Sequence, residues 1–453
     1  MKIVVLGAGY VGLTTSACLA ELGHMVTCCD VDGARVAALQ NAQVPIYEPG
    51  LAELIAEQAQ AGRLHFTTQS SKAAGDADAV FLAVGTPSDA SGDIDLSYVD
   101  AAAKTIAPYL KSSAIIVLKS TVVAGTARRV KVLVDASRGH SDIAVASNPE
   151  FLREGSAIKD FLQADRIVIG TDEPQSEKVL RKVYAPLLLR GVPLVATETV
   201  NAELIKYAAN ALLALKIGFI NDVADLCEKL GGDVTAVADG IGRDHRIGTN
   251  FLSAGPGFGG SCFPKDTRAF ASTGRRHGAP QPLVETLIER NEVRKQALAE
   301  RIIDAAPRHG RVAVLGTSFK ANTDDVRDAA SLTIVPMLVE AGLEVHLHDP
   351  QPDGAKRLLT EVGWHDSALD AARDADVTVF LTEWDEYRTL SLPRLAKAMR
   401  GRMLLDYRNI IDRESAAAAG FAYQGLGRSA AIPAPARRGK GTPAMASVAA
   451  SPA

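Results

Sequence analysis

A cysteine that follows a glycine-rich loop is the strongest chemical signal in the chain. Four of the six residues 255–260 are glycine, Cys262 comes two positions later, and Lys265 and Asp266 follow it closely. Glycines let backbone N–H groups come close to a reacting oxygen, and a nearby cation favours the thiolate, the nucleophilic form of cysteine. This stretch therefore predicts a catalytic cysteine rather than a structural one.

The other four cysteines carry no such pattern. Cys18, Cys28, Cys29 and Cys227 lie in apolar stretches, and the total of five is odd and irregularly spaced. This distribution argues against a disulfide framework, and no pair has the spacing of a zinc site. We therefore expect free thiols, no metal and a cytoplasmic protein, because the apolar N-terminus lacks a signal-peptide cleavage pattern.

A glycine turn near the N-terminus predicts a dinucleotide site. The turn GAGYVG carries Gly7, Gly9 and Gly12 between a β-branched strand and a helical segment, and a second apolar run ends in Asp30. The glycines permit a tight turn, a close approach to a pyrophosphate, and close packing of helix on strand. Asp30 would accept hydrogen bonds from the ribose and repel a 2′-phosphate, which favours NAD over NADP.

Residues at other strand ends are candidates for the same cofactor site. Ligands bind at the carboxyl ends of strands in open parallel sheets, and further apolar runs end there. The candidates, besides Tyr10 and Val11 of the turn, are Gly85, Thr86, Pro87, Ser120 and Thr121. Arg35 keeps NADP open as an alternative, since a guanidinium can pair with a phosphate.

Alternating strands and helices predict a parallel α/β domain in the first part of the chain. After the first two strands, further ones are expected at Ala79–Val84, Ala114–Leu118, Ile143–Ala146 and Arg166–Ile169. From Val200 to Leu230 apolar residues recur at helical spacing instead, which predicts one long helix. A further helix is expected over Leu283–Ala305.

The α/β pattern restarts at Arg311, but Gly316 there lacks the full glycine fingerprint. The expected elements are strands Val312–Leu315, Glu344–His348, Val377–Leu381 and Met403–Leu405, and a helix Ser331–Ala341. We thus predict two Rossmann-like, doubly wound domains, residues 1–196 and 306–429, joined by a central helical domain over 197–305. The Ala-, Pro-, Gly- and Ser-rich tail 430–453 is expected to be disordered.

The bulk composition is that of an ordinary globular protein. The 453 residues are 47% hydrophobic and 23% charged, and the net charge is −4. Without a basic excess we expect no nucleic-acid partner. Without an apolar run of about 18 residues we expect no membrane span.

Several motifs, in a fixed order, resemble the UDP-glucose/GDP-mannose dehydrogenase family. They are GAGYVG at Gly7, VGTP at Val84, KSTV at Lys119, NPEFLREGSAIKDF at Asn148, Lys206 with Asn210, GFGGSCFPKD at Gly257 and SFKANTDDVRDA at Ser318. The resemblance covers nearly everything from Met1 to Gly427. It departs at Val123–Thr126, where the family often has a proline, and this places no catalytic residue in doubt.

The resemblance implies a four-electron oxidation of a nucleotide sugar by two NAD in turn. Asp266, with a water held by Thr121, would help take the proton of a primary alcohol. Cys262 would attack the resulting aldehyde, and the thiohemiacetal would lose a second hydride to become a thioester.

The remaining catalytic roles implied by the family belong to three polar residues. Glu150 would be the general base that hydrolyses the thioester. Lys206 would stabilise the oxyanion at C6, and Asn210, four residues further along the same helix, would position water or substrate.

The resemblance also implies binding residues. Contacts to the cofactor are expected from Glu154, Lys265 and Arg327. Contacts to the nucleotide sugar are expected from Glu150, Phe151, Leu152, Arg153, Lys206, Asn210, Phe251, Gly257, Phe258, Gly259, Gly260, Cys262, Phe319, Lys320 and Arg408. The resemblance also implies that Arg246 comes from the partner subunit of a homodimer. The long helix is apolar beyond one stripe and so needs a second packing partner, and the resemblance makes that partner another copy of the chain.

Alternatives remain at this point. UDP-glucose is the favoured substrate, and a GDP-mannose dehydrogenase is the nearest rival. A UDP-N-acetylmannosamine dehydrogenase is less favoured, because Ser261 stands where that branch usually has histidine. A non-catalytic NAD sensor is disfavoured by Cys262, Lys265 and Asp266, and two NADH per substrate would exclude a two-electron hydroxyacid dehydrogenase.

Overall fold

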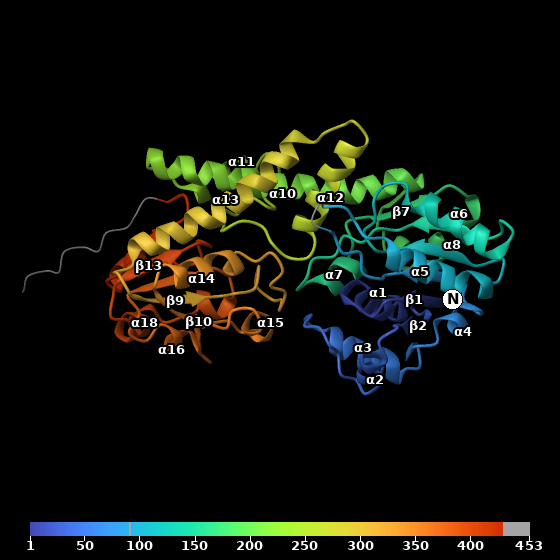
Figure 1. Ribbon diagram of the computed structural model, residues 1–453, viewed down its shortest axis with the longest axis horizontal. Coiled ribbons are helices and arrows are strands. Elements are labelled where there is room, and N and C mark those ends of the chain that lie inside the picture. The colour runs from blue at the N-terminus through green and yellow to red at the C-terminus, as the bar shows by residue number, and fades with distance from the viewer. Residues whose placement is uncertain (90–91, 429–453) are drawn as a thin grey trace, which may run out of the picture.

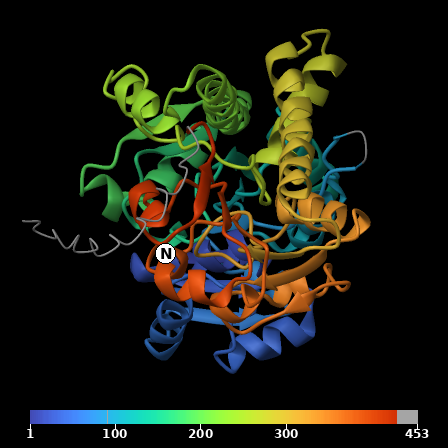
Figure 2. The same ribbon diagram turned by 90° about the vertical axis from the view of Figure 1, so that its left-hand side faces the viewer.

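Two sheet domains lie side by side under a layer of long helices in the computed structural model (Figure 1). The structure describes residues 1–89 and 92–428, so the tail predicted for 430–453 lies outside the described residues. In the end-on view the long helices, drawn in green and yellow, lie in the upper part of the molecule (Figure 2). The predicted class, two Rossmann-like domains with a helical part between them, is confirmed.

The first domain is built on an eight-stranded sheet in the order β3-β2-β1-β4-β5-β6-β7-β8. Its strands are β1 (Lys2–Leu6), β2 (Met25–Cys29), β3 (Leu64–Thr67), β4 (Ala79–Leu82), β5 (Ile115–Leu118), β6 (Ala144–Ser147), β7 (Ile167–Thr171) and β8 (Leu194–Thr197). Its helices are α1 (Tyr10–Glu21), α2 (Gly33–Gln40), α3 (Leu51–Gln60), α4 (Ser70–Ala74), α5 (Ser97–Ile106), α6 (Thr126–Arg138), α7 (Ala157–Leu162), α8 (Pro174–Val183) and α9 (Ala185–Leu188), with a 3-10 turn at Ala107–Tyr109. The central strands are apolar throughout because helices cover both faces of the sheet.

Two strands of this sheet, β7 and β8, run against our prediction of a parallel arrangement. β7 is antiparallel to β6, while β7 and β8 are parallel. A parallel neighbour would need a crossover to the opposite edge, whereas an antiparallel neighbour starts at the edge where the previous strand ends. The connection 148–166 therefore stays at the carboxyl edge of β6, and the predicted site residues of this segment lie at that edge of the sheet.

The second domain has a six-stranded parallel sheet in the order β11-β10-β9-β12-β13-β14. Its strands are β9 (Arg311–Leu315), β10 (Glu344–His348), β11 (Gly363–Trp364), β12 (Val377–Phe380), β13 (Met403–Asp406) and β14 (Ala422–Gly425). Its helices are α14 (Ser331–Glu340), α15 (Asp353–Lys356), α16 (Ala368–Ala371), α17 (Asp385–Arg388), α18 (Leu392–Ala398) and α19 (Arg413–Ala418). Two apolar clusters fill the two faces of this sheet.

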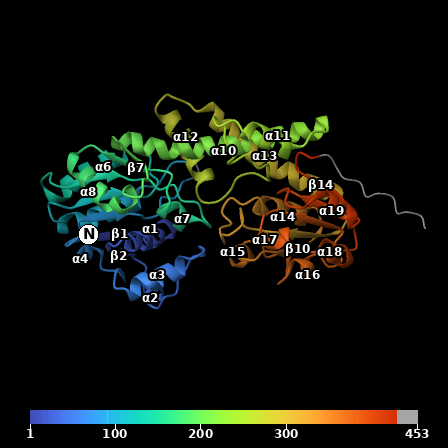
Figure 3. The same ribbon diagram turned by 180° about the vertical axis from the view of Figure 1, so that it is seen from behind.

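The central helices are α10 (Thr199–Leu230), α11 (Val234–Gly242), α12 (Phe263–Arg276) and α13 (Pro282–Ala305). α10 has 32 residues and would span roughly 48 Å, and it runs over both sheet domains in the view from behind (Figure 3). The chain enters the second sheet domain from α13 and leaves it beside α10 and α11. There the Val234 amide donates to the Gly427 carbonyl (2.8 Å) and Arg428 pairs with Asp233 (3.2 Å).

A buried carboxylate ties α10 to the first domain. Glu203 is 1% exposed, and it accepts hydrogen bonds from the amides of Gly125 (2.6 Å) and Ala127 (2.8 Å) at the start of α6. It thereby satisfies N–H groups that no residue of α6 itself caps. No helix in the described part of the chain is both long and apolar enough to cross a membrane.

Two glycines of the turn before and within α1 differ in how closely they are packed, and this difference can be tested by measuring stability. A Cβ at Gly12 would stand 1.8 Å from the Gly7 carbonyl oxygen, whereas a Cβ at Gly9 would have nothing within 4 Å. We expect Gly12→Ala to lower the free energy of unfolding by about 1–3 kcal/mol, and Gly9→Ala to change it by less than about 0.5 kcal/mol. Urea unfolding followed by circular dichroism measures both, and equal losses would contradict this packing.

Candidate active site

Four segments of the chain meet around Cys262. They are the loop that follows β6 (148–156), the first half of α10, the loop 255–262 that leads into α12, and the loop 318–328 of the second domain. Cys262 itself is the residue that precedes α12, and its Sγ lies 3.4 Å from the Ser261 hydroxyl. The site therefore draws on both sheet domains and on the helices between them.

The thiol of Cys262 is held in its neutral form. Burial raises its pKa to about 11, the carboxylates of Glu150 and Asp266 add to this, and Lys206 acts against it. The expected cation, Lys265, points elsewhere: its ammonium group donates to Asp266 at 2.7 Å. The prediction of a cation-favoured thiolate is thus wrong for this state of the site, because desolvation outweighs the cation that is present.

Lys206 and Glu150 form a buried ion pair next to this thiol. Their side chains are 3% and 4% exposed, and Lys206 Nζ lies 2.8 Å from Glu150 Oε1. The other oxygen of Glu150 accepts the Leu152 amide at 2.5 Å. Burial alone would raise the pKa of Glu150, but Lys206 holds it below its usual value, so Glu150 stays ionised. Burial likewise opposes a high pKa at Lys206, and Glu150, Cys262 and Asp266 raise it.

Asp266 is fully buried, and both of its oxygens are occupied. Asn210 Nδ2 donates to Oδ2 at 2.6 Å, and Lys265 Nζ donates to Oδ1 at 2.7 Å. Asn210 lies one turn beyond Lys206 on α10, so one helix holds both carboxylates of the cluster. Thr121 lies in the loop after β5, and among the described residues none of the predicted catalytic side chains is hydrogen-bonded to it.

Glu154 joins three of the four segments. Its carboxylate accepts hydrogen bonds from the hydroxyls of Ser261 (2.8 Å) and Thr323 (3.1 Å), and Arg327 lies 3.7 Å away. Burial and the neighbouring Asp325 carboxylate raise its pKa to about 7. In this structure Glu154 therefore links the Cys262 loop to the second domain, and Arg327 pairs mainly with Asp325 at 2.7 Å.

The predicted cofactor carboxylate lies at the end of β2. Asp30 accepts the amides of Ala8 (2.7 Å) and Asp32 (2.9 Å), which fixes it beside the glycine turn. Arg35 pairs with it at 3.2 Å. At the ends of β4 and β5, the Ser120 hydroxyl donates to the carbonyls of Leu82 and Val84 and so ties the two strand ends together.

The glycines of the Cys262 loop leave no room for side chains. A Cβ at Gly260 would stand 2.8 Å from the Phe319 ring, and one at Gly257 would stand 2.7 Å from Asn291 Oδ1. Asn291 of α13 also accepts the Phe258 amide and donates to the Phe258 carbonyl. Asn291 was not predicted, although a buried asparagine within an otherwise amphipathic helix is a signal for such a role.

Other predicted substrate residues differ in how close they lie to the site. Arg408 donates to the Phe319 carbonyl at 2.6 Å, and Lys320 lies over the Phe319 ring at 5.5 Å. Phe251 packs against Phe263, the first residue of α12. Arg246 is far more exposed, with a side chain 79% accessible, and within the described part of the chain it pairs only with Asp244. In its own chain Arg246 is not part of the cluster.

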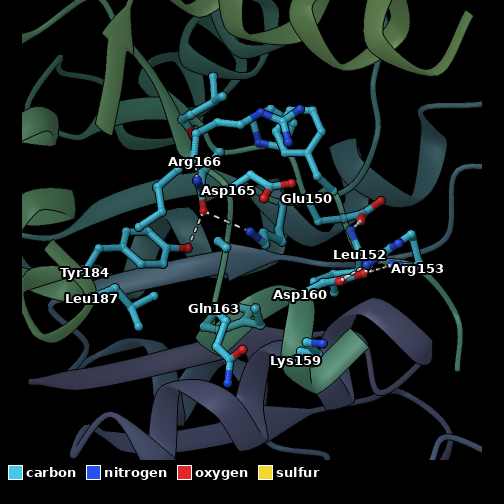
Figure 4. Close-up of a pocket in the computed structure, with 18 residues that line it drawn as sticks. Glu150, Leu152, Arg153, Lys159, Asp160, Gln163, Asp165, Arg166, Tyr184 and Leu187 are labelled. Atoms are coloured by element: carbon cyan, nitrogen blue, oxygen red, sulfur yellow. Dashed lines mark hydrogen bonds and ion pairs between the residues drawn. The ribbon is translucent and has the colours of Figure 1, made fainter. Parts of the chain in front are cut away.

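A cavity of about 190 Å³ lies behind the Glu150 loop, between that loop, α7 and β7. Figure 4 shows Glu150, Arg166 and Tyr184 among its lining residues. Arg166 stacks on the Phe151 ring at 3.8 Å, and Arg153 pairs with Asp160 at 2.6 Å. The predicted substrate segment thus separates this polar cavity from the Cys262 cluster.

Two buried polar residues at the cavity, Lys119 and Asn148, were not predicted to be site residues. Lys119 donates to Asn148 Oδ1 at 3.1 Å, and the Tyr184 hydroxyl donates to the same oxygen. Burial lowers the pKa of Lys119 to about 8, although Glu150 acts in the opposite direction. Both residues open motifs that the sequence had singled out, KSTV and NPEF, yet only their neighbours were given roles.

The ion pair in the cluster gives a test of its electrostatics. We expect Lys206→Met to lower the free energy of unfolding by about 3–5 kcal/mol at neutral pH, because Glu150 is left buried without its partner. Without Lys206 the pKa of Glu150 rises, so the loss should shrink as the pH falls and Glu150 becomes protonated. Urea unfolding between neutral and acidic pH measures this.

The matched control is Lys216→Met on the same helix, where the ammonium group donates to the carbonyls of Ile247 and Gly248. That variant should differ from the parent by less than about 0.5 kcal/mol. Equal losses in the two variants, or a loss that does not vary with pH, would contradict the pairing of Lys206 with Glu150.

The chain is similar to known proteins over nearly its whole length. Three models of the UDP-glucose/GDP-mannose dehydrogenase family match it: the NAD binding domain over residues 1–188, the central domain over 200–293 and the UDP binding domain over 313–413. A UDP-glucose 6-dehydrogenase of Rhizobium meliloti is 47% identical, covering 94% of this chain and 100% of the relative. A UDP-glucose 6-dehydrogenase of Bacillus subtilis is 42% identical, covering 95% of this chain and 94% of the relative.

The fold is shared as well. A solved UDP-glucose dehydrogenase from Pyrobaculum islandicum superimposes with a TM-score of 0.86 at 37% identity, covering 94% of this chain and 97% of that one. Family models match the NAD-binding, central and UDP-binding parts in order, and full-length relatives keep more than two fifths of the residues. The chain therefore belongs to the UDP-glucose/GDP-mannose dehydrogenase family.

Proposed function

We propose that the chain oxidises the C6 alcohol of UDP-glucose to the carboxylate of UDP-glucuronate, with two NAD and one water. The names of the relatives support this substrate. The observation that carries the proposal is the buried cluster in which the Cys262 thiol, the Lys206 cation and two carboxylates meet. All five cysteines are free thiols, which fits the cytoplasmic location that we propose.

The glycine turn fits NAD. α1 has no side-chain cap, so its first N–H groups are available to a pyrophosphate, and the space beside Gly9 is open. Asp30 is fixed beside the turn, where a ribose would lie. Bound NAD accepts one hydride in each of the two oxidation steps.

Asp266 acts in the first oxidation. It takes the C6 hydroxyl proton through a water near Thr121 as the hydride leaves, and the product is an aldehyde. Asn210 and Lys265 each hold one carboxylate oxygen, so the base keeps one orientation while a lone pair stays available for the proton.

Cys262 then bonds to the aldehyde carbon. With a pKa of about 11 the sulfur carries its proton until it attacks, and that proton ends on the C6 oxygen of the thiohemiacetal. Lys206 stabilises the negative charge that develops on this oxygen during the attack. Loss of the second hydride and of the hydroxyl proton gives the thioester.

Hydrolysis completes the reaction. Glu150, kept ionised by Lys206, removes a proton from a water that attacks the thioester carbon. The carbon–sulfur bond breaks, the carboxylate leaves, and the Cys262 sulfur is protonated again.

We also propose a homodimer. Leu212, Phe219 and Leu226 recur every seven residues along α10, and each is more than half exposed in the single chain. Seven residues are close to two helical turns, so the three side chains form one apolar stripe. A second copy of the chain would bury this stripe and bring its exposed Arg246 to the substrate site of its neighbour.

The covalent mechanism predicts different outcomes at two cysteines. The parent enzyme should give two NADH per UDP-glucose, and Cys262→Ser should give no steady turnover while binding NADH and UDP-glucose within a few-fold of the parent, because a hydroxyl is a far weaker nucleophile. Cys227→Ser, on the buried face of α10 and in an apolar cluster, should remain active. Absorbance at 340 nm and calorimetry measure these quantities.

Parent-like turnover of Cys262→Ser would overturn the covalent step. Faster NADH formation from GDP-mannose or UDP-N-acetylmannosamine than from UDP-glucose would overturn the proposal that UDP-glucose is the substrate. One NADH per substrate would instead assign a two-electron dehydrogenase.

Shared active sites predict complementation between two inactive variants. Arg246→Ala and Cys262→Ser, mixed under conditions that allow subunit exchange, should regain activity, because some mixed dimers hold one site with both residues intact. Activity per mixed dimer should approach half that of the parent. If mass spectrometry shows mixed dimers and the mixture stays inactive, Arg246 does not serve the neighbouring site.

A further inference from the structure

Glu48 is a buried carboxylate outside the cluster around Cys262. It lies in the segment between α2 and α3 and is 5% exposed. Its Oε2 accepts hydrogen bonds from the Tyr10 hydroxyl (2.5 Å) and the Gly155 amide (2.6 Å), and its Oε1 accepts the Ala157 amide (2.8 Å). One side chain thus holds two segments that are more than a hundred residues apart in the sequence.

The first of these segments is the glycine turn. Tyr10 is the first residue of α1 and directly follows Gly9. Burial raises the pKa of Tyr10, and the hydrogen bond to Glu48 raises it further, so the phenol keeps its proton and remains a donor to the carboxylate. A pyrophosphate bound at the start of α1 would lie against the backbone of Tyr10, and cofactor binding would therefore restrict the residue that holds Glu48.

The second segment is the loop that carries Glu150 and Glu154. Gly155 follows Glu154 directly and has a φ of +79°, and a Cβ there would stand 2.7 Å from the Asn322 carbonyl oxygen of the second domain. Glu154 in turn accepts the Ser261 hydroxyl at 2.8 Å. A continuous series of contacts therefore leads from Tyr10 through Glu48 and Gly155 to the neighbour of Cys262.

We infer that Glu48 is a positioning residue that couples the dinucleotide site to the sugar-nucleotide site. Occupancy of the glycine turn fixes Tyr10 and, through Glu48, the loop 148–157 that a sugar nucleotide would contact. A loop that is already ordered by one ligand binds the next one more tightly, because the ordering entropy has been spent. The inference rests on the proposed function for the identity of the two ligands.

Calorimetry with NADH and UDP-glucose, a pair that does not react, tests this inference. The coupling factor is the Kd of NADH alone divided by its Kd with saturating UDP-glucose, and the reverse titration must give the same factor. We expect a factor above about five for the parent and a factor near one for Tyr10→Phe and Glu48→Gln. Tyr10→Phe removes only the phenol hydroxyl and leaves both backbone contacts of Glu48, so it remains informative if Glu48→Gln fails to fold.

The matched control is Tyr387→Phe, which removes the hydroxyl of another buried tyrosine, one that donates to the His348 carbonyl within the second domain. Its coupling factor should equal that of the parent, since a general loss of stability does not change a ratio of affinities. Parent-like coupling in Tyr10→Phe, or a parent that binds both ligands without coupling, overturns the inference alone. A parent that binds neither ligand overturns the proposed function, and this inference with it.

Discussion

An ammonium group buried beside a thiol has to be paired, and much of this architecture satisfies that requirement. Lys206 is 2% exposed, and its partner Glu150 lies 56 positions away in the sequence. A charge in such surroundings is tolerated only when its partner is held firmly in place. The rigid α10 supplies one side of the pair, and the loop at the carboxyl edge of β6 supplies the other. Because β7 runs antiparallel to β6, this loop does not cross to the opposite edge.

The loops around the site are held by carboxylates that other elements supply. Glu203 of α10 accepts hydrogen bonds from amides at the start of α6, and Glu48 accepts them from amides at the start of α7. Glu154 accepts hydrogen bonds from two hydroxyls, one in the central domain and one in the second domain. Each of these side chains is at least nine-tenths buried and accepts hydrogen bonds that would otherwise be left unsatisfied. Long connections can thus remain ordered at the edge of a sheet without secondary structure of their own.

The sequence was most informative where a feature is local. The glycine turn with Asp30, the long helix and the Cys262 loop each depend on neighbouring residues, and their positions agree with the prediction. All four strands that were not predicted, β3, β8, β11 and β14, are the outer strands of the two sheets. An outer strand is covered on fewer sides and needs no continuous apolar run. Its sequence therefore lacks the pattern by which we predicted the other strands.

Long-range partners were beyond the reach of the sequence. That Asn291 would hold Phe258 and that Glu48 would meet Tyr10 both depend on how distant segments pack. The raised pKa of Cys262 has the same origin, because it reflects burial by four segments rather than the residues next to it in the chain. The roles of individual site residues remain predictions that rest on family resemblance and on this geometry.

The attachment of the second sheet domain has a mechanical consequence. The chain enters this domain from α13 and, at its other end, Gly427 and Arg428 return to Val234 and Asp233 beside α10. A body held by a single linker can swing in any direction, whereas one held at two separate points can turn only about the line that joins them. The two attachments therefore restrict rotation of the second sheet domain relative to α10, and with it the directions in which Phe319 and Arg408 could move relative to Cys262.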